Sequence, residues 1–491
     1  STWTGTGNID VDPIFVDTAS GDYYLLATSQ LINAGHPDSL DSDGTIADIG
    51  AYPYLNSYSG PTWYITEGGN DTTGTGASGD PFRSIQSGIN FSSDADSVTV
   101  AAGTYVENIN FRGRNIKVVG ADQETTIIDG DSSGSVVTFN SGETQSALLK
   151  NFTITNGNAN GSSWPDNNGG GIFCRVSSPI LSNLTITGNN ASVNGAGVAI
   201  ENGSSPLLEN SLIINNTSGE SGGGIYVSDV STPVFTNVDI KENISSDNGG
   251  GVYLFSGGTG LGFYDCYVQD NTAGGSGGGI YAENSSFTLD GVTVSNNTST
   301  GDDPLISEAG GISVSTENGS SNKHIHIINS IISGNTASGG SSTGGLFFFD
   351  IDSVTITSTE INGNSGMHTG GLYTNQVNYF NMSSSLVAEN TGLYYGGVSF
   401  LATANENPAQ ITNCTITNNS YTDLGSEGNA AGLMVERWAF ASILNSIITS
   451  EQSPAVTVGN HGTDGSAELT IGYSLISDGQ DSIDVYEDGT L

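Results

Sequence analysis

The sequence has very little positive charge. It contains 9 lysine and arginine residues against 51 aspartate and glutamate residues, so the formal net charge of its 491 residues is −42. Such a surface repels nucleic acid, anionic lipid and acidic polysaccharide unless cations intervene. We therefore exclude nucleic-acid binding. The acidic charge suits an extracellular or salt-rich setting and divalent cation binding, although a requirement for solubility alone explains it equally well.

Cysteines and long apolar runs are also scarce. Cys174, Cys266 and Cys414 are far apart and form neither a CxxC motif nor an even disulfide framework, so we expect three buried thiols that act as small hydrophobes. No apolar run reaches roughly 18 residues and no signal peptide is present, so the sequence predicts no transmembrane segment. Because the chain does not start with Met, we interpret it as a mature or excised piece.

Glycine, by contrast, is abundant, and it recurs in a repeat. Clusters of small residues followed by an aliphatic residue, such as GGGIY ending at Tyr226 and GGGVY ending at Tyr253, return with a period of about 27 residues. A second pattern with this period ends in asparagine, as in NVDIKEN from Asn237 to Asn243. Its final asparagines are Asn189, Asn216, Asn243, Asn271, Asn297, Asn335, Asn364, Asn390 and Asn419.

Each repeat contains short runs that alternate with a period of two, separated by Gly and Asn, and none has helical periodicity. A unit this short cannot bury its own apolar face, whereas stacked units bury a continuous core. The sequence therefore predicts an all-β parallel solenoid. We expect the recurrent asparagines to form a ladder whose side-chain amides bond from one coil to the next.

The pairing of GG[AG][ILV] with [ILV]xxN, as in IKEN and VQDN, resembles the polymorphic outer-membrane protein repeats. More broadly, it resembles the right-handed parallel β-helix proteins of the pectin-lyase-like superfamily, over roughly residues 63 to 476. The resemblance implies a right-handed parallel β-helix, secreted or at the cell surface of a bacterial-type source. It leaves function open, because that superfamily includes lyases, hydrolases, adhesins and surface fibres.

The same resemblance suggests how the chain is organised. A short amphipathic helix is expected within DPFRSIQSGI, where Phe82, Ile85 and Ile89 would plug the first coil. We divide the chain into a separate terminal-cap-like segment, a linker, the N-terminal cap with the first coils, an insertion loop, regular coils and a C-terminal tail. Their ranges are 1–57, 58–62, 63–157, 158–168, 169–476 and 477–491.

The first segment resembles the ending that usually follows the last coil of such proteins. Either the chain is one period of a tandem or head-to-tail assembly, in which residues 1–57 contact the C-terminal coils of a neighbouring copy, or it is an arbitrary piece of a longer protein. A head-to-tail contact that does not close generates a filament. Self-association is therefore the expected partnership, with polysaccharide as a second partner.

Two surface features could bind ligands. Calcium prefers closely spaced carboxylates, and HPDSLDSDG contains a fragment of such a loop; an Asp-rich turn capped by its own side chains is the alternative. The candidate calcium ligands are Asp38, Asp41, Asp43 and Asp48.

Alternation also places an aromatic column on the outside, as a face for sugar rings or another fibre, or else as a ladder under a loop. Its members are Phe173, Tyr226, Tyr253, Tyr281, Phe347 and Tyr373.

Catalytic residues are harder to find. A glycoside hydrolase needs two carboxyl groups about 5 to 9.5 Å apart. The best cluster is Asp239, Glu242 and Asp270 beside Lys241, with solvated turn charges as the alternative. The sequence thus favours a non-enzymatic, secreted or cell-surface structural or adhesive solenoid. The alternative is a carbohydrate-active enzyme, either a polysaccharide lyase or a glycoside hydrolase, or a glycan-binding module.

Overall fold

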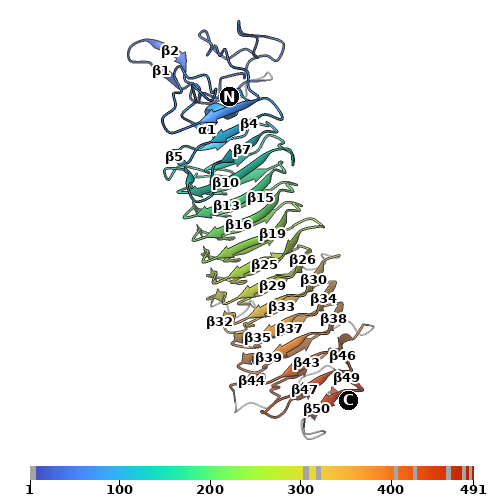
Figure 1. Cartoon of the computed structure of the whole chain (residues 1–491). Helices are drawn as coiled ribbons and strands as arrows, with labels where there is room; N and C mark the ends of the chain where they lie inside the picture. The colour runs from blue at the N-terminus through green and yellow to red at the C-terminus, as the bar shows by residue number, and fades with distance from the viewer. Residues whose placement is uncertain are drawn as a thin grey trace.

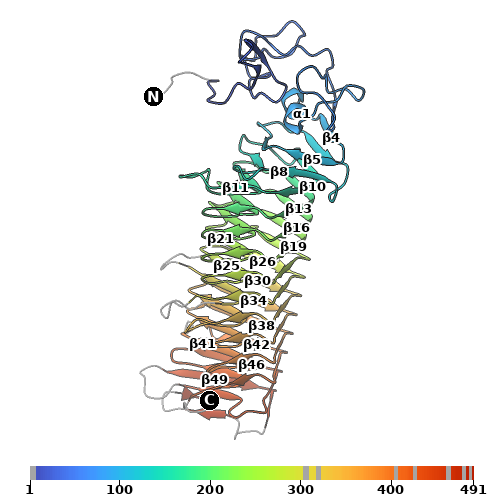
Figure 2. The ribbon, with the colours of Figure 1, turned by 90° about the vertical axis from the view of Figure 1, so that its left-hand side faces the viewer.

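The computed structural model describes residues 7–301, 309–316, 322–402, 407–423, 428–459, 466–477, 483–485 and 489–491. Its strands stack in successive coils along one axis, with the N-terminal segment at one end and the C-terminus at the other (Figures 1 and 2). The coils pair in parallel and in register. The predicted parallel β-solenoid is confirmed.

Two sheets each take one short strand from every coil that contributes to them. The long sheet has fourteen strands: β6 (Ile109–Asn110), β9 (Val137–Phe139), β12 (Ile172–Arg175), β15 (Val198–Glu201), β18 (Ile225–Ser228), β21 (Val252–Phe255), β25 (Ile280–Glu283), β29 (Ile312–Ser315), β33 (Leu346–Phe349), β37 (Leu372–Asn375), β41 (Val398–Leu401), β45 (Leu433–Val435), β48 (Val456–Val458) and β51 (Ile483–Val485). The narrow sheet has ten: β11 (Asn158–Ala159), β14 (Asn190–Ala191), β17 (Thr217–Ser218), β20 (Ile244–Ser245), β24 (Thr272–Ala273), β28 (Thr298–Ser299), β32 (Thr336–Ala337), β36 (Ser365–Gly366), β40 (Thr391–Gly392) and β44 (Ser420–Tyr421).

The remaining coil strands form a wide sheet of two columns, which four long strands join. These are β10 (Leu148–Thr155), β13 (Ile180–Thr187), β16 (Leu207–Ile214) and β19 (Val234–Lys241). The first column adds β3 (Thr62–Ile65), β4 (Ser97–Val100), β7 (Lys117–Gly120), β22 (Gly262–Tyr264), β26 (Phe287–Asp290), β30 (His324–Ile328), β34 (Ser353–Thr357), β38 (Tyr379–Ser383), β42 (Ala409–Thr412), β46 (Phe440–Leu444), β49 (Ala467–Gly472) and β52 (Gly489–Thr490). The second adds β5 (Gly103–Val106), β8 (Thr126–Asp129), β23 (Tyr267–Gln269), β27 (Thr293–Ser295), β31 (Ile331–Ser333), β35 (Glu360–Asn362), β39 (Leu386–Ala388), β43 (Thr415–Thr417), β47 (Ile447–Thr449) and β50 (Leu475–Ile476).

The corners between these sheets explain why the sequence is rich in Asn, Asp and Gly. Where the long strand β19 bends, Asn237 has φ 53°, and the equivalent residue one coil later, Asp265, also has φ 53°. Glu242 and Asp270, just before two ladder asparagines, have φ 55° and 57°. Asn, Asp and Gly tolerate this left-handed region better than most residues. The repeat therefore encodes its turns through backbone conformation.

The ladder asparagines line the interior next to the narrow sheet. Asn271 donates from Nδ2 to Asn297 Oδ1 at 3.0 Å, and the same bond links each of the nine residues to the next, from Asn189 to Asn419. The same Oδ1 accepts the backbone N–H of the preceding rung, as for Asn271 N at 3.0 Å. These bonds satisfy polar groups that are almost completely buried.

The N-terminal cap contains the helix α1 (Ile85–Phe91), which is buried along its length. Its first turn is capped from outside: Glu107 accepts the N–H groups of Ile85 and Gln86 at 2.7 and 3.0 Å. Asp71 Oδ1 accepts those of Arg83 and Ser84. Phe82, Ile85 and Ile89 are fully buried, and they close the apolar core at this end of the solenoid.

Residues 7–57, which include the hairpin of β1 (Phe15–Asp17) and β2 (Asp22–Leu25), pack on this cap (Figure 2). Leu25 and Ile32 are buried in the main core, and Asn90 Nδ2 donates to the carbonyls of Ala27 and Ser29, both at 2.9 Å. Residues 7–57 thus pack on the N-terminal cap of their own chain, and their contact with the C-terminal coils of a neighbouring copy stays a prediction.

Candidate functional site

The outer face of the long sheet carries the aromatic column. Its rings contact one another between coils at a tilt, with centroids 5.6 Å apart for Tyr226 and Tyr253 and 5.3 Å apart for Tyr253 and Tyr281. However, Phe173, Tyr226, Phe347 and Tyr373 are each less than 10% exposed, at 5, 9, 4 and 7%, and Tyr253 and Tyr281 are half-buried. Four of the six rings are therefore buried, and the other two keep partial exposure.

A glycine in the preceding loop explains part of this burial. Gly222, Gly249 and Gly277 each have φ +66°, and a Cβ atom added to them would lie 2.7–3.1 Å from the Cβ of Tyr226, Tyr253 and Tyr281, respectively. The loop backbone thus approaches the base of each outward tyrosine more closely than any other residue type would allow. This close approach favours a ladder under a loop over an open face for sugar rings.

Beside this column, the insertion loop is fixed by a buried glutamate. Glu201 is 2% exposed and accepts hydrogen bonds from Trp164 Nε1 at 2.9 Å and Asn168 Nδ2 at 2.7 Å. Burial raises the pKa of its carboxyl. The Arg175 guanidinium carbon lies 4.5 Å from the centroid of the Trp164 ring. The indole of Trp164, itself 51% exposed, is therefore held in one orientation at the surface.

A second buried glutamate lies towards the C-terminal end of the same face. Glu436 is 6% exposed and accepts a hydrogen bond from Ser399 Oγ at 2.9 Å, and burial raises the pKa of its carboxyl to about 7. Burial, and then the charge of Glu436, raise the pKa of the Tyr373 and Tyr395 phenols well above the usual value. Outward position on this sheet thus does not make Glu201 or Glu436 solvent-exposed.

His368 packs against the same tyrosines. Its ring centroid lies 5.0 Å from Tyr373, 5.8 Å from Tyr394 and 5.0 Å from Tyr395. Its carbonyl oxygen accepts the N–H groups of Tyr394 and Tyr395 at 3.2 and 3.1 Å. Burial lowers the pKa of this imidazole to about 4. His368 is therefore a neutral packing group near pH 7, and Glu436 is the group in this cluster that titrates there.

The predicted catalytic cluster is not gathered into a comparable site. Glu242 and Asp270 are exposed at equivalent left-handed corners of successive coils, and Asp239 and Lys241 lie on β19. Across the described part of the chain, His36 and Asp38 form the one pair of oppositely charged side-chain types within 4.0 Å. Lys241 therefore forms no such pair with Asp239, Glu242 or Asp270. This exposed geometry matches the solvated turn charges that the sequence left as the alternative.

The carboxylates of the Asp-rich loop bind backbone groups. Asp48 accepts the N–H groups of Asn33 and Tyr54, both at 2.8 Å, and Asp43 accepts that of Asn56 at 2.8 Å. Asp41 Oδ2 accepts the N–H of Asp48 at 2.8 Å, while Asp38 is exposed. Within the described ranges, no group of three or more His, Cys, Asp or Glu residues could hold a metal ion. The loop has the form of a turn capped by its own side chains.

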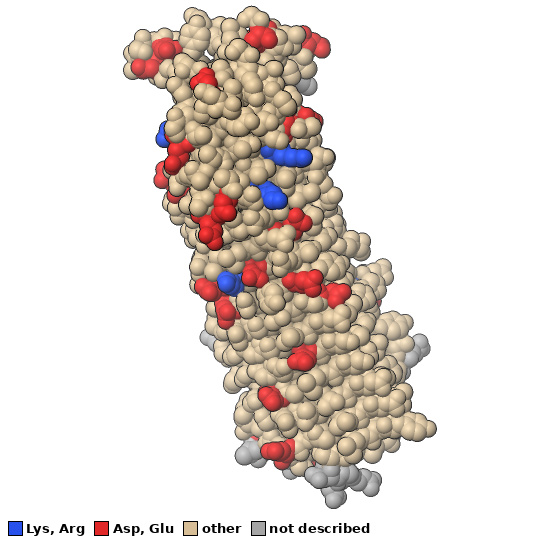
Figure 3. All heavy atoms as spheres, viewed as in Figure 1, with Lys and Arg blue, Asp and Glu red and all other residues tan. Residues whose placement is uncertain are grey.

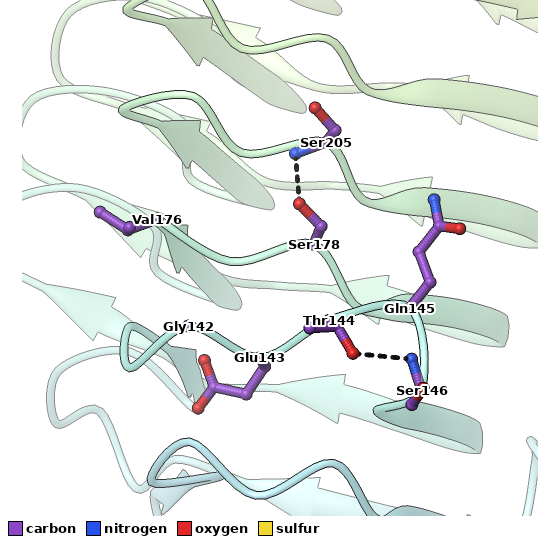
Figure 4. A pocket seen from close by; sticks show the side chains of 8 residues that line it. All are labelled: Gly142, Glu143, Thr144, Gln145, Ser146, Val176, Ser178 and Ser205. Atoms are coloured by element: carbon purple, nitrogen blue, oxygen red, sulfur yellow. Dashed lines mark hydrogen bonds between the residues drawn. The ribbon is translucent and has the colours of Figure 1, made fainter.

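A shallow polar hollow of about 560 Å³ lies at the turns of three successive coils, between Glu143, Ser178 and Ser205 (Figure 4). Ser178 Oγ accepts the N–H of Ser205 at 3.0 Å. The Glu143 carboxylate accepts hydrogen bonds from Gly113 N at 2.7 Å and Ser177 Oγ at 2.7 Å. Because this carboxylate already has partners, the hollow offers no free ionisable group from Glu143.

The sequence did not predict a second groove, which lies on the wide sheet. It has a volume of about 450 Å³ and lies around Tyr379, which is 58% exposed. A row of outward polar residues on neighbouring strands is the sequence signal that could have indicated this groove. The row consists of Thr355, Asn381 and Gln410. The sequence also did not predict the fixed orientation of the Trp164 indole, because the insertion-loop sequence carries no signal for its hydrogen bond to Glu201.

The charge distribution agrees with the composition. Acidic groups are spread over the visible face, whereas basic groups there are few and lie in its N-terminal half (Figure 3). No helix in the described ranges is both long enough and apolar enough to cross a bilayer. A ligand that approaches this face therefore meets mostly negative charge.

Comparisons with known proteins identify the class. Residues 106–299 match the family model described as a right-handed beta helix region. Together with the coil geometry, this match confirms the predicted right-handed parallel β-helix. The comparison with curated proteins finds no match.

The solved structures to which this chain is similar are distant in sequence. They include the A-module of the mannuronan C-5 epimerase AlgE6 of Azotobacter vinelandii, at 13% identity and a TM-score of 0.45, covering 79% of this chain and 92% of that one. A pectin methylesterase from carrot has 12% identity, a TM-score of 0.30 and coverage of 67% and 84%. The catalytic domain of a GH87 alpha-1,3-glucanase, in complex with tetrasaccharides, has 14% identity, a TM-score of 0.38 and coverage of 90% and 73%.

Proposed function

We propose that this chain is a non-enzymatic, adhesive β-solenoid that acts outside the cytoplasm as a rigid surface element. The observation that carries the proposal is the unbroken ladder from Asn189 to Asn419, which binds successive coils together through buried amides. The paired carboxylates that the sequence offered for catalysis, Glu242 and Asp270, are exposed turn residues. The buried polar groups of the molecule therefore connect its coils and stiffen the solenoid.

A head-to-tail assembly through residues 1–57 is not included in the proposal. Leu25 and Ile32 of that segment are part of the core of their own cap. The adhesive role instead depends on the sides of the solenoid, where each coil adds about 4.8 Å of surface in the same orientation. Ligands on this surface must tolerate the high negative charge, which favours neutral partners.

Adhesion and catalysis can be separated directly. Beads that carry the chain are expected to attach to cells or polysaccharide-coated surfaces under flow, compared with beads that carry a heat-denatured sample. A panel of soluble glycans, with and without calcium, is expected to yield neither reducing ends nor unsaturated products. Beads that fail to attach, or products that accumulate with time, would contradict the proposal.

A second candidate function is a carbohydrate-active enzyme, with the buried carboxyl of Glu436 as its candidate proton-exchanging group. This carboxyl has a pKa of about 7 and neighbouring tyrosines, so it could exchange a proton at neutral pH. Turnover of any glycan in the panel that is lost in Glu436→Gln, but retained in the exposed control Glu242→Gln, would establish this function instead.

A further inference from the structure

The groove around Tyr379, named here the Tyr379 groove, is built from three neighbouring strands of the wide sheet. In β34, β38 and β42, Val354, Phe380 and Ile411 point into the core and are at most 3% exposed. The residues next to them in sequence, Thr355, Asn381 and Gln410, therefore point outward. Asn381 pairs with Thr355 on one side and Gln410 on the other. Their side chains thus form a row along the solenoid axis.

Among the residues that the structure describes, the lining of this groove contains no charged residue, although the chain has a net charge of −42. Tyr379, which is 58% exposed, offers an aromatic face, and Asn381 offers amide donors and an acceptor. Gln410 Nε2 donates to Pro408 O at 3.0 Å, which leaves the amide oxygen and one N–H of Gln410 for a ligand. Asp352 lies close by, but its carboxylate accepts the N–H of Lys323 at 3.0 Å and Asn378 Nδ2 at 3.2 Å. The described lining is therefore an uncharged polar and aromatic surface on a strongly acidic molecule.

This chemistry suits one class of ligand. A saccharide has hydroxyl groups for amide side chains and an apolar C–H face for an aromatic ring, whereas an anionic ligand would find no cation in the lining. An extended peptide would need a free strand edge for main-chain pairing. None is free here, because β38 pairs with β34 on one side and β42 on the other. The volume of about 450 Å³ falls within the usual range for small-ligand clefts.

We propose that the Tyr379 groove binds a neutral oligosaccharide, with the tyrosine ring against a sugar face and Asn381 and Gln410 on its hydroxyl groups. This inference rests on the adhesive function proposed above and names its ligand class. Because the polar row runs along the axis, the bound glycan lies parallel to the solenoid and contacts three successive coils. The groove lies on the wide sheet, away from the long-sheet residues Glu201 and Glu436.

Binding is tested with the intact chain by isothermal titration calorimetry. The probes are neutral hexaoses of the cello, xylo, manno and laminari series, with oligogalacturonate and oligomannuronate as charged counterparts. We expect at least one neutral hexaose to bind and the charged ones not to. Tyr379→Ala is expected to weaken binding at least tenfold and Gln410→Glu to weaken it several-fold. The matched control Tyr267→Ala, at a tyrosine of the same sheet that is 46% exposed, should bind like the native chain.

The outcomes separate this inference from the proposed function. Circular dichroism of each variant verifies that the coils are intact. The proposal that the Tyr379 groove binds a neutral oligosaccharide would be overturned if no neutral hexaose binds. Equal affinity of the Tyr379→Ala and Tyr267→Ala variants would overturn it as well. Beads that carry Tyr379→Ala but still attach like native beads would also overturn it and leave the adhesive function standing. A hexaose that binds in the groove and is then cleaved would support the groove and reject the non-enzymatic function.

Discussion

Asn271 and Asn297 occupy the same position in successive coils, and Asn297 Oδ1 accepts both the side-chain and backbone N–H groups of Asn271 at 3.0 Å. Asn297 Nδ2 in turn donates to Val268 O at 2.9 Å and to Asn335 Oδ1 at 3.0 Å. All four hydrogen bonds of one buried amide are therefore used within the stack. A single rung is thus connected to the coils on both sides.

Replacing this rung is expected to destabilise the solenoid. Asn297→Ala leaves buried N–H groups of Asn271 without an acceptor, and each such group costs about 1–3 kcal/mol. The urea midpoint should fall, compared with the control Asn190→Ala at an exposed strand position. Equal midpoints for the two variants would show that the ladder contributes little to stability.

Glu436 should make stability depend on pH near neutrality. Its folded pKa of about 7 lies above the ordinary value of 4.5, so the folded state binds this proton more tightly than the unfolded state does. The stabilisation is complete below about pH 4.5 and is lost as the pH rises through 7, a difference of about 3 kcal/mol. Glu436→Gln, which stays neutral, is expected to melt above the native chain at pH 8 but close to it at pH 4.5. A constant difference across this range would contradict the burial argument.

His368 should make stability depend on pH in the opposite direction, with a loss at acidic pH. Its folded pKa of about 4 lies below the ordinary value of 6.5, so the unfolded state binds the proton first as the pH falls. Its contribution is complete above pH 6.5 and is lost progressively towards pH 4. His368→Phe, which keeps an aromatic ring between the tyrosines, should reduce the acid-induced fall in melting temperature. The exposed His324→Phe serves as the control and should leave that fall unchanged.

Glu201 should hold the insertion loop. Glu201→Ala removes the acceptor of both the Trp164 and Asn168 hydrogen bonds. We expect faster amide hydrogen exchange across residues 161–168 and faster quenching of Trp164 fluorescence by acrylamide, measured against Glu283→Ala on the same face. Unchanged exchange in the Glu201 variant would mean that the stacking of Arg175 on Trp164 is sufficient to fix the loop.

The Asp-rich loop should depend on its carboxylates more than on calcium. Asp48 accepts two backbone N–H groups, so Asp48→Ala should increase proteolysis of residues 7–57, whereas Asp38→Ala, at an exposed aspartate, should not. Removal of calcium with EGTA is expected to leave the melting temperature unchanged. A rise of several degrees on adding millimolar calcium would instead favour the metal site that the sequence suggested.

The alternation and period of the sequence by themselves determined the coil, because apolar residues at every second position can be buried only when successive short strands stack. They also placed the asparagine ladder, since one amide per repeat returns at the same position. Tertiary structure alone decided what is exposed. Tyr226 and Glu201 point outward as alternation requires, yet loops from other parts of the coil cover them, whereas Tyr379 stays open. It also decided that residues 7–57 pack on the cap of their own chain, because Leu25 and Ile32 find apolar partners there, and local sequence does not specify such distant contacts.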